Sequence, residues 1–178
     1  MKNGVTTAWD DVTQAELNPE MVKAARQTEM DYFEKLKVYD RVPREHQLTT
    51  GGNIIGVRWV DVNKGDIAEP NYRSRLVGRE FNTHRDDTLY ASTPPLEALR
   101  TVISHAATWD KSGRRRSVMI NDVRRAYFYA VATRDLYIEL PAEDGQATSG
   151  MLGKLNLCLY GTRDAAKGWQ DTLSKQLE

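Results

Sequence analysis

Short apolar runs constrain the fold of this chain more than any other feature of its sequence. The longest runs, such as Ile54-Ile55-Gly56-Val57, cover only a few residues, far below the roughly 20 that a membrane-crossing helix needs. They alternate with stretches in which apolar residues recur at helical spacing, without the regular repeat of a parallel doubly wound sheet. These patterns predict a single α+β domain with a mainly antiparallel sheet.

Three stretches have the apolar spacing of helices. The first begins at Asn18, a favourable cap followed by Pro19, and runs to about residue 38. The second begins near residues 93–95, and the third covers about residues 163–177. The first helix is expected to turn a charged face to solvent, formed by Lys23, Glu29, Glu34 and Lys37. The positions expected to be buried are Leu96, Leu99, Ile103 and Ala106 in the second helix and Ala166, Trp169, Leu173 and Leu177 in the third.

The remaining apolar runs have the length and residue types of strands. Residues 54–62 and 72–81 are separated by a turn at residues 63–66 and predict a hairpin. Residues 117–120 predict a buried strand that delivers Asp122 at its carboxyl end. Further strands are expected at residues 38–42, 136–140 and 152–157, with a loop at residues 141–150.

The charge of the chain is balanced overall but uneven along the sequence. The formal net charge of zero argues against a strong non-specific nucleic-acid binder, because neutralising phosphates requires clustered Lys and Arg. Residues 111–125 nevertheless carry six basic side chains and one acidic side chain, Asp122. By itself the run from Arg114 to Arg116, after Gly113, is typical of a solvated turn.

Cysteine usage and the first residues narrow the class of protein further. Cys158 is the only cysteine, which excludes an internal disulfide and a cysteine-rich zinc site, and we expect it in the core. The first residues lack the apolar segment of a secretory signal and the arginine-rich pattern of a transit peptide. We therefore expect an intracellular protein, cytoplasmic or nuclear, that is not secreted and has no membrane partner.

Asp122 is the strongest candidate for chemistry among the individual residues. A carboxylate at the end of an apolar strand is a suitable ligand for Mg²⁺, which prefers oxygen and shares its shell with phosphate and water. The same carboxylate is equally suited to cap a following helix, and its position leaves both interpretations open. The histidines do not have metal-ligand spacing; they are His46, His84 and His105.

Short motifs in a fixed order surround Asp122. Residues 122–128 read Asp-Val-Arg-Arg-Ala-Tyr-Phe, which resembles the first catalytic motif of reverse transcriptases, Asp-Val-x-x-Ala-aromatic. The flanking motifs are Val42-Pro43, Arg58-Trp59-Val60, Arg73 to Phe81, Ser92-Thr93-Pro94, Leu136 to Pro141, Lys154-Leu155 and Leu159 to Trp169. Together they cover nearly the whole chain and are similar, in order and content, to copia-type retrotransposon reverse transcriptases.

This resemblance implies part of an RNA-directed DNA polymerase of a retrotransposon Pol polyprotein. Such a nucleotidyltransferase uses an RNA template, a DNA primer, deoxynucleotide triphosphates and two ions of Mg²⁺ or Mn²⁺. About residues 1–110 would form the amino-terminal helix and fingers, and about residues 111–178 the start of the palm with a second fingers/palm helix. The remainder of the Pol polyprotein would be a further partner.

The resemblance also implies roles for individual residues. It implies metal ligation by Asp122 and the carbonyl of Val123, and nucleotide binding by Arg73, Arg75, Ala126 and Tyr127. Strand alternation places both arginines on one face of the predicted hairpin, and an Arg fork suits phosphate. Tyr127 falls where the family places the aromatic residue that blocks a ribose 2'-hydroxyl. Its own surroundings are equally typical of a half-buried aromatic, and exposed hairpin arginines are often plain surface.

Several positions depart from the family pattern or have no assigned role. Asp164 stands where Gln is common and Ala166 where Pro is common; Lys154 and Arg163 are motif positions of undefined role. A carboxylate 4 Å from a triphosphate would repel it by ~1 to 4 kcal/mol. Asp164 would avoid this repulsion if it turned away from the nucleotide as a helix-start residue.

The second aspartate motif of such polymerases, aromatic-x-Asp-Asp between apolar strands, is not found before the chain ends. The pairs Asp10-Asp11 and Asp86-Asp87 are not flanked by apolar strands. The sequence therefore leaves enzymatic activity of these 178 residues open. The alternatives are a catalytically incomplete remnant that binds nucleic acid or a partner and, with less support from the ordered motifs, an unrelated α+β interaction domain.

Overall fold

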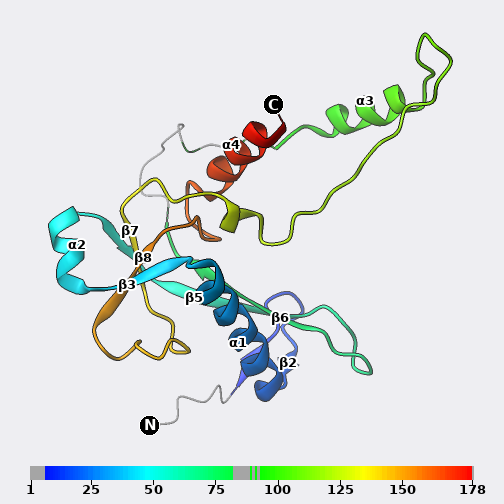
Figure 1. The fold of residues 1–178 in the computed structure, drawn as a ribbon. Helices are drawn as coiled ribbons and strands as arrows, with labels where there is room; N and C mark the ends of the chain where they lie inside the picture. Colours follow the sequence, from blue (N-terminus) through cyan, green and yellow to red (C-terminus); the bar gives the residue numbers. More distant parts are fainter. Residues whose placement is uncertain (1–6, 82–88, 90, 92, 178) are drawn as a thin grey trace.

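Helices and strands alternate in the computed structural model, which describes residues 7–81, 89, 91 and 93–177 (Figure 1). The helices are α1 (Pro19–Leu36), α2 (Arg44–Thr50), α3 (Leu96–Ala106), the short 3-10 helix η2 (Ala126–Tyr129) and α4 (Ala165–Leu177). The strands are β1 (Ala8–Trp9), β2 (Glu16–Leu17), β3 (Tyr39–Pro43), β4 (Asn53–Ile55), β5 (Val57–Asn63), β6 (Tyr72–Gly78), β7 (Leu136–Glu139) and β8 (Met151–Leu155). His84, Asp86, Asp87 and Ser92 lie outside the described residues.

The largest sheet has the strand order β3-β8-β7-β4. β3 pairs with β8 and β8 with β7 in antiparallel register, whereas β4 joins β7 in parallel. Leu136, Tyr137 and Ile138 are all buried, so β7 is covered on both faces and carries the middle of the core. The mixed α/β architecture with mainly antiparallel pairing agrees with the predicted fold class.

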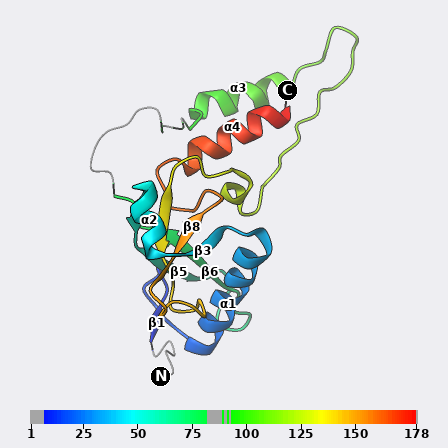
Figure 2. The same cartoon turned by 60° about the vertical axis from the view of Figure 1, so that its left-hand side comes forward.

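The hairpin predicted from the sequence is present as β5 and β6. They pair in antiparallel register from Val57 opposite Gly78 to Asn63 opposite Tyr72. Helix α1 packs against β6, as Figure 2 shows from the side. Arg26 on α1 also connects the helix to the other strand of the hairpin, because it forms ion pairs with Asp61 of β5 (2.6 Å) and, outside the hairpin, with Glu143 (2.8 Å).

Helix α1 begins and ends where local chemistry predicts. The Asn18 side chain accepts hydrogen bonds from the backbone N–H groups of Glu20 and Met21, which satisfies two donors at the start of the helix. The helix ends at Leu36, where Lys37 adopts a left-handed conformation (φ 52°). The expected strand at residues 38–42 then follows as β3.

The apolar run at residues 54–62 is not one strand, contrary to the prediction. Gly56 separates β4, which belongs to the large sheet, from β5, which belongs to the hairpin. Periodicity shows that both pieces are extended but does not show which partner each one takes. The preceding residues form α2, a helix that the sequence pattern did not predict.

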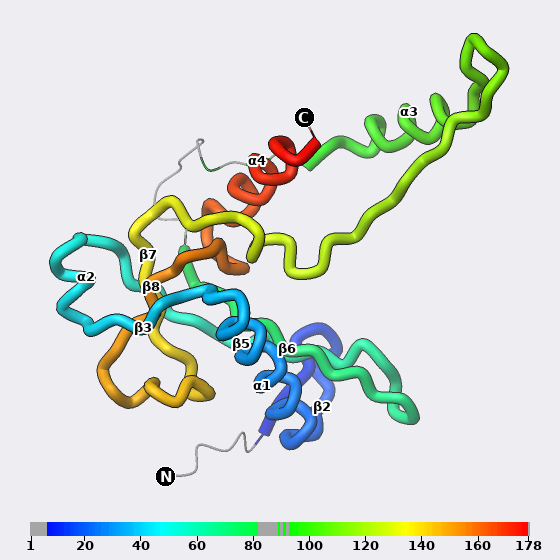
Figure 3. Tube along the Cα trace, in the orientation of Figure 1, coloured from blue at the N-terminus to red at the C-terminus, as the bar shows by residue number. Residues whose placement is uncertain are grey.

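The predicted buried strand at residues 117–120 is wrong. This segment belongs to no strand, and Met119 and Ile120 are largely exposed, at 82% and 91%. A strand requires a neighbour that takes up its backbone N–H and C=O groups. No strand among the described residues runs beside this segment, which loops away from the sheets between α3 and η2 (Figure 3).

Helices α3 and α4 lie close to their predicted positions, but their apolar faces are mostly uncovered. Most of the side chains expected to be buried are exposed; they are Leu96, Leu99, Ile103, Leu173 and Leu177. The others are half-buried; they are Ala106, Ala166 and Trp169. Apolar spacing identifies the face of a helix that can be buried, whereas tertiary neighbours decide whether it is.

Cys158 is buried beside Ala130 and Ala165, as predicted, and burial raises the pKa of its thiol to about 11. In the ranges that the structure describes, none of the helices combines the length and apolar character required to span a membrane.

We predict that Gly161→Ala destabilises the fold by about 3 kcal/mol in urea unfolding. Gly161 has a φ of +83°, and an added Cβ would lie 2.2 Å from the carbonyl oxygen of Gly78. The matched control is Gly150→Ala, at φ +75° with nothing within 4 Å of the added Cβ. Gly150→Ala should be destabilised by only about 1 kcal/mol, the cost of a left-handed backbone conformation for a residue with a Cβ. Equal losses for the two variants would show that the contact with Gly78 is not tight.

Candidate functional site

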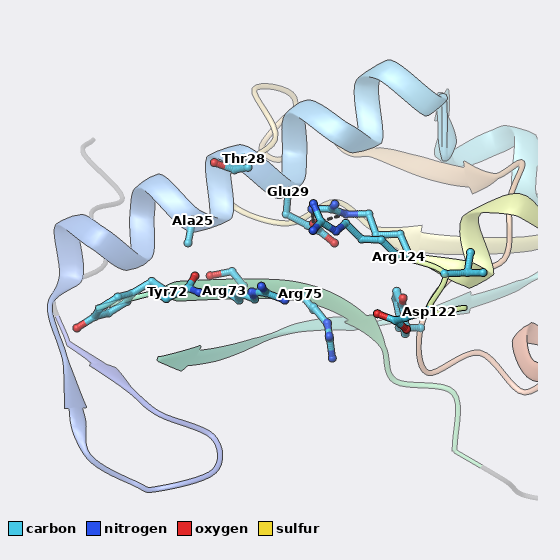
Figure 4. Close-up of a pocket in the computed structure, with 13 residues that line it drawn as sticks. Ala25, Thr28, Glu29, Tyr72, Arg73, Arg75, Asp122 and Arg124 are labelled. Atoms are coloured by element: carbon cyan, nitrogen blue, oxygen red, sulfur yellow. Dashed lines mark hydrogen bonds and ion pairs between the residues drawn. The ribbon is translucent and has the colours of Figure 1, made fainter. Parts of the chain in front are cut away.

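A cleft of about 560 Å³ lies between α1 and β6 and is closed on one side by the segment that precedes η2 (Figure 4). Its wall is strongly polar and comes from four separate parts of the chain. The lining residues are Ala25, Thr28, Glu29, Asn71, Tyr72, Arg73, Ser74, Arg75, Asp122, Val123, Arg124, Arg125 and Tyr160. The cleft therefore brings together four residues singled out from the sequence, namely Asp122, Val123, Arg73 and Arg75.

Strand alternation on β6 determines the direction of the two arginines. Ser74 and Leu76 are buried, and the Ser74 hydroxyl donates a hydrogen bond of 2.6 Å to the Asp61 carboxylate. Arg73 and Arg75 alternate with them and are exposed on the opposite face of β6; both arginines, like Ser74, belong to the lining of the cleft. The guanidinium carbon of Arg75 lies 5.7 Å from the centroid of the Tyr160 ring, which contributes a cation–π contact.

An ion pair between the partly exposed Arg125 and the buried Glu29 holds residues 122–125, here called the Asp122 segment, against α1. Arg125 donates to one carboxylate oxygen of Glu29 through Nη2 (2.6 Å) and Nε (3.0 Å). Its guanidinium also stacks on Tyr32, 3.7 Å from the ring centroid. Arg125 is in the left-handed region (φ 55°), which is costly for a residue with a side chain. The contacts with Glu29 and Tyr32 offset this cost and position Asp122, three residues earlier.

The prediction that Glu29 lies on a solvated face is wrong, since its exposed fraction is only 3%. Glu29 is seven residues after Val22 and four before Phe33, both of which are buried. It therefore belongs to the helix stripe that faces the core, and this spacing was the available signal. The charge of Glu29 nevertheless favoured an exposed position, because a carboxylate is rarely buried without a partner. Its partner Arg125 is distant in sequence, so the local pattern did not reveal the pair.

Asp122 itself is exposed in irregular backbone and lines the cleft opposite Arg75 (Figure 4). It makes no hydrogen bond or ion pair with any described residue, and it does not cap η2, whose first flanking residue is Arg125. Its oxygens are therefore available for a ligand. Nowhere in the described ranges do three carboxylate, imidazole or thiol groups gather around a metal-sized space. Asp122 thus supplies one hard oxygen ligand, which suits an ion held mainly by phosphate and water.

Ala126 and Tyr127, for which the resemblance implies nucleotide binding, do not line the cleft. Tyr127 is half-buried, packs on the cluster around Cys158 and contacts Tyr160 with ring centroids 4.8 Å apart. Tyr160 lines the cleft and touches both Tyr127 and Arg75. In the sequence Tyr160 stands out only as part of a motif, because nothing in the local pattern shows which strand or loop it faces.

Asp164 does not line the cleft and is turned toward Arg134. Arg134 forms paired hydrogen bonds of 2.8 and 2.9 Å with Asp164 and of 2.7 and 2.9 Å with Glu80. The backbone N–H of Arg163 donates to the same Glu80 carboxylate (2.8 Å). The remaining motif position, Lys154 on β8, pairs with Asp135, the residue before β7, at 3.1 Å and likewise does not line the cleft.

In the cluster of Glu80, Arg134 and Asp164, charge pairing has a larger effect on the pKa values of the two carboxyl groups than burial has. Burial by itself would raise the pKa of Asp164 and of Glu80, but the hydrogen bonds and charge of Arg134 lower both below their usual values. Hydrogen bonds to Glu80 and then to Asp164 raise the pKa of Arg134. All three groups are therefore ionised near neutral pH, and the carboxylate of Asp164 is neutralised locally. The repulsion expected for a carboxylate facing a triphosphate does not apply to this geometry.

Comparison with known proteins connects this geometry to a family. Residues 37–178 match the family model described as reverse transcriptase (RNA-dependent DNA polymerase). Over 153 residues the chain is 28% identical to a retrovirus-related Pol polyprotein from transposon TNT 1-94 of Nicotiana tabacum. That similarity covers 82% of this chain but only 11% of the relative's length. None of the solved structures gives a significant match.

We predict that Glu29→Gln loosens the Asp122 segment. Glutamine keeps the shape of the side chain but removes the charge that Arg125 pairs with, so local opening should increase about tenfold. Limited trypsin digestion reports this as faster cleavage after Arg124 and Arg125, relative to cleavage at the exposed residues 114–116. The control is Glu34→Gln, which removes the exposed partner of Arg41 on the same helix. Identical digestion of the two variants would contradict the anchoring role of Glu29.

We predict that Arg134→Gln destabilises the protein by about 3 kcal/mol at pH 7, because it leaves the carboxylates of Glu80 and Asp164, both largely removed from water, without their counter-ion. The control Arg44→Gln removes an exposed ion pair with Glu139 and should cost under about 1 kcal/mol. Urea unfolding measures both values. A loss for Arg134→Gln no larger than that of the control would contradict the prediction.

The same variant should reverse the pH dependence of stability. In the wild type the pKa values of Glu80 and Asp164 are lower in the folded than in the unfolded state. Their contribution to the free energy of unfolding is therefore complete above the unfolded pKa, about 4, and is lost as pH falls through the folded pKa values. Without Arg134, burial and mutual repulsion raise both pKa values, so stability is lost as pH rises. The loss of unfolding free energy caused by Arg134→Gln, measured by urea unfolding, should therefore be larger at pH 7 than at pH 4.

Proposed function

The chain belongs to the reverse transcriptase (RNA-dependent DNA polymerase) family, of the copia type found in retrotransposons, and we propose that the cleft between α1 and β6 is its nucleotide-binding site. One observation carries this proposal. Arg73, Arg75 and Asp122 come from distant parts of the sequence and line a single cleft. They are the residues for which the family motifs imply contacts with the triphosphate and its ions.

The two arginines supply the positive charge that a triphosphate requires. Both are exposed to the cleft from the same strand, and their planar guanidinium groups can each donate two hydrogen bonds to phosphate oxygens. Glu29, the other carboxylate in the lining besides Asp122, is neutralised by Arg125. The charge of the cleft therefore favours an anion while leaving Asp122 as an oxygen donor.

Asp122 and the Val123 carbonyl would hold a divalent ion, magnesium or manganese, together with the phosphates of the nucleotide. When bound, such ions would activate a primer 3'-hydroxyl and stabilise the leaving pyrophosphate. Tyr160 forms one wall of the cleft, and Tyr127, which does not line the cleft, would act on the ribose only indirectly, by packing against the Tyr160 ring. The task of the chain's own residues is to position the nucleotide and neutralise its charge.

In this proposal about residues 1–110 form the amino-terminal helix and fingers, and about residues 111–178 begin the palm. The protein would use an RNA template and a DNA primer as part of a Pol polyprotein. Since the described residues offer only Asp122 as a free carboxylate in the cleft, polymerisation would require further ligands from an aromatic-x-Asp-Asp hairpin. Nucleotide binding, in contrast, is assigned to the 178-residue chain itself.

We predict that Arg73→Gln and Arg75→Gln each weaken binding of a deoxynucleotide triphosphate by about tenfold in the presence of Mg²⁺, since each removes a charge-assisted contact. Asp122→Asn should remove the dependence of binding on Mg²⁺. Titration calorimetry with the 178-residue chain measures both effects, with Arg44→Gln as a control outside the cleft. In a longer chain that includes an aromatic-x-Asp-Asp hairpin, Asp122→Asn should abolish primer extension. Unchanged nucleotide affinity in both arginine variants would refute the site.

A further inference from the structure

The residues that follow α3 form a basic arm, defined here as residues 107–116, which projects away from the sheets (Figures 1 and 3). Trp109 and Arg115 face each other across the arm in an isolated antiparallel bridge. The arm carries four basic side chains, Lys111 and Arg114 to Arg116, and one acidic side chain, Asp110. The arm is therefore a region of concentrated positive charge, although the formal net charge of the whole chain is zero.

The tip of the arm is held in one conformation by Asp110. One oxygen of its carboxylate accepts hydrogen bonds of 2.8 Å from the backbone N–H groups of Ser112 and Arg114. Gly113 provides the left-handed turn (φ +75°), and its N–H donates to the Asp110 carbonyl at 3.0 Å. The hydrogen bonds of the Ser112 side chain and the Arg114 backbone lower the pKa of Asp110, so these contacts persist at neutral pH. The arm is thus preformed for a ligand.

The side chains along the arm combine an aromatic surface with fixed positive charge. Trp109 is 60% exposed, and the guanidinium carbon of Arg115 lies 5.1 Å from its ring centroid. Arg116 donates to the Thr108 hydroxyl (3.1 Å) and to the His105 carbonyl (3.3 Å) and contacts the His105 ring (2.6 Å), which holds it beside the end of α3. Lys111 makes no ion pair with a described residue. An exposed indole beside clustered cations is the arrangement by which proteins stack a base and bind its phosphates.

We propose that the basic arm binds single-stranded nucleic acid, with Trp109 as the stacking platform for a base and Lys111, Arg114, Arg115 and Arg116 as phosphate contacts. An acidic peptide would satisfy the charge but leave the exposed face of Trp109 without a partner, whereas a nucleotide satisfies both. The inference goes beyond the nucleotide-binding cleft, because none of the residues that line the cleft belongs to the arm.

The test measures binding of a fluorescein-labelled 20-residue oligouridine to the full chain by anisotropy across a salt series. Trp109→Leu should weaken binding about tenfold through lost stacking, and its matched control is Trp9→Leu, at an indole that is 56% exposed elsewhere. The triple variant Arg114→Gln/Arg115→Gln/Arg116→Gln should reduce the slope of log affinity against log salt by about 2, since each phosphate contact contributes about 0.7. The charge-matched control is Lys23→Gln/Lys35→Gln/Arg44→Gln.

Several results would overturn the proposal. They are absence of binding by the wild type at low salt, equal affinities of Trp109→Leu and Trp9→Leu, equal slopes for the two triple variants, and competition by polyglutamate as strong as by unlabelled oligouridine. Deoxynucleotide binding in the cleft should be unchanged in the arm variants. Failure of the arm and failure of the cleft are therefore distinguishable, because each has its own ligand and its own variants.

Discussion

The buried ion pair between Glu29 and Arg125 is the contact on which the arrangement of the cleft depends. It joins the middle of α1 to a segment 96 positions later in the sequence, and Glu29 is almost completely removed from water. A buried carboxylate without its partner would be strongly unfavourable, so the two segments are held together specifically. Because Arg125 is fixed, the residues just before it, including Asp122, face β6.

A second arginine neutralises two further carboxylates. Arg134 binds the carboxylates of Glu80, just after β6, and Asp164, just before α4. This pairing explains how a carboxylate is accommodated where the family commonly has glutamine, since Asp164 is neutralised and turned away from the cleft. In both clusters an arginine neutralises carboxylates, and among the described residues Asp122 is the carboxylate without an ion pair that lines the cleft together with Arg73 and Arg75.

The uncovered apolar surface shows the limit of reasoning from periodicity. The spacing in α3 and at residues 117–120 correctly identifies side chains that are suited to burial, yet most of them are exposed. Burial requires a second surface, and the described residues bring no strand beside residues 117–120 and no extensive contact to α3. In contrast, β7 and β8 have antiparallel partners within the chain, and the strands predicted at residues 136–140 and 152–157 are confirmed.

The sequence alone determined the elements whose causes are local, together with the family. Asn18 and Pro19 define the start of α1, alternation defines the β5–β6 hairpin, and the ordered motifs around Asp122 identify a reverse transcriptase. Only the tertiary structure decided that Gly56 divides one apolar run between two sheets, that Glu29 is buried and that Asp164 pairs with Arg134. The physical reason is that caps and strand alternation depend on neighbours in sequence, whereas burial and ion pairing depend on neighbours in space. A single sequence contains no direct record of those spatial neighbours.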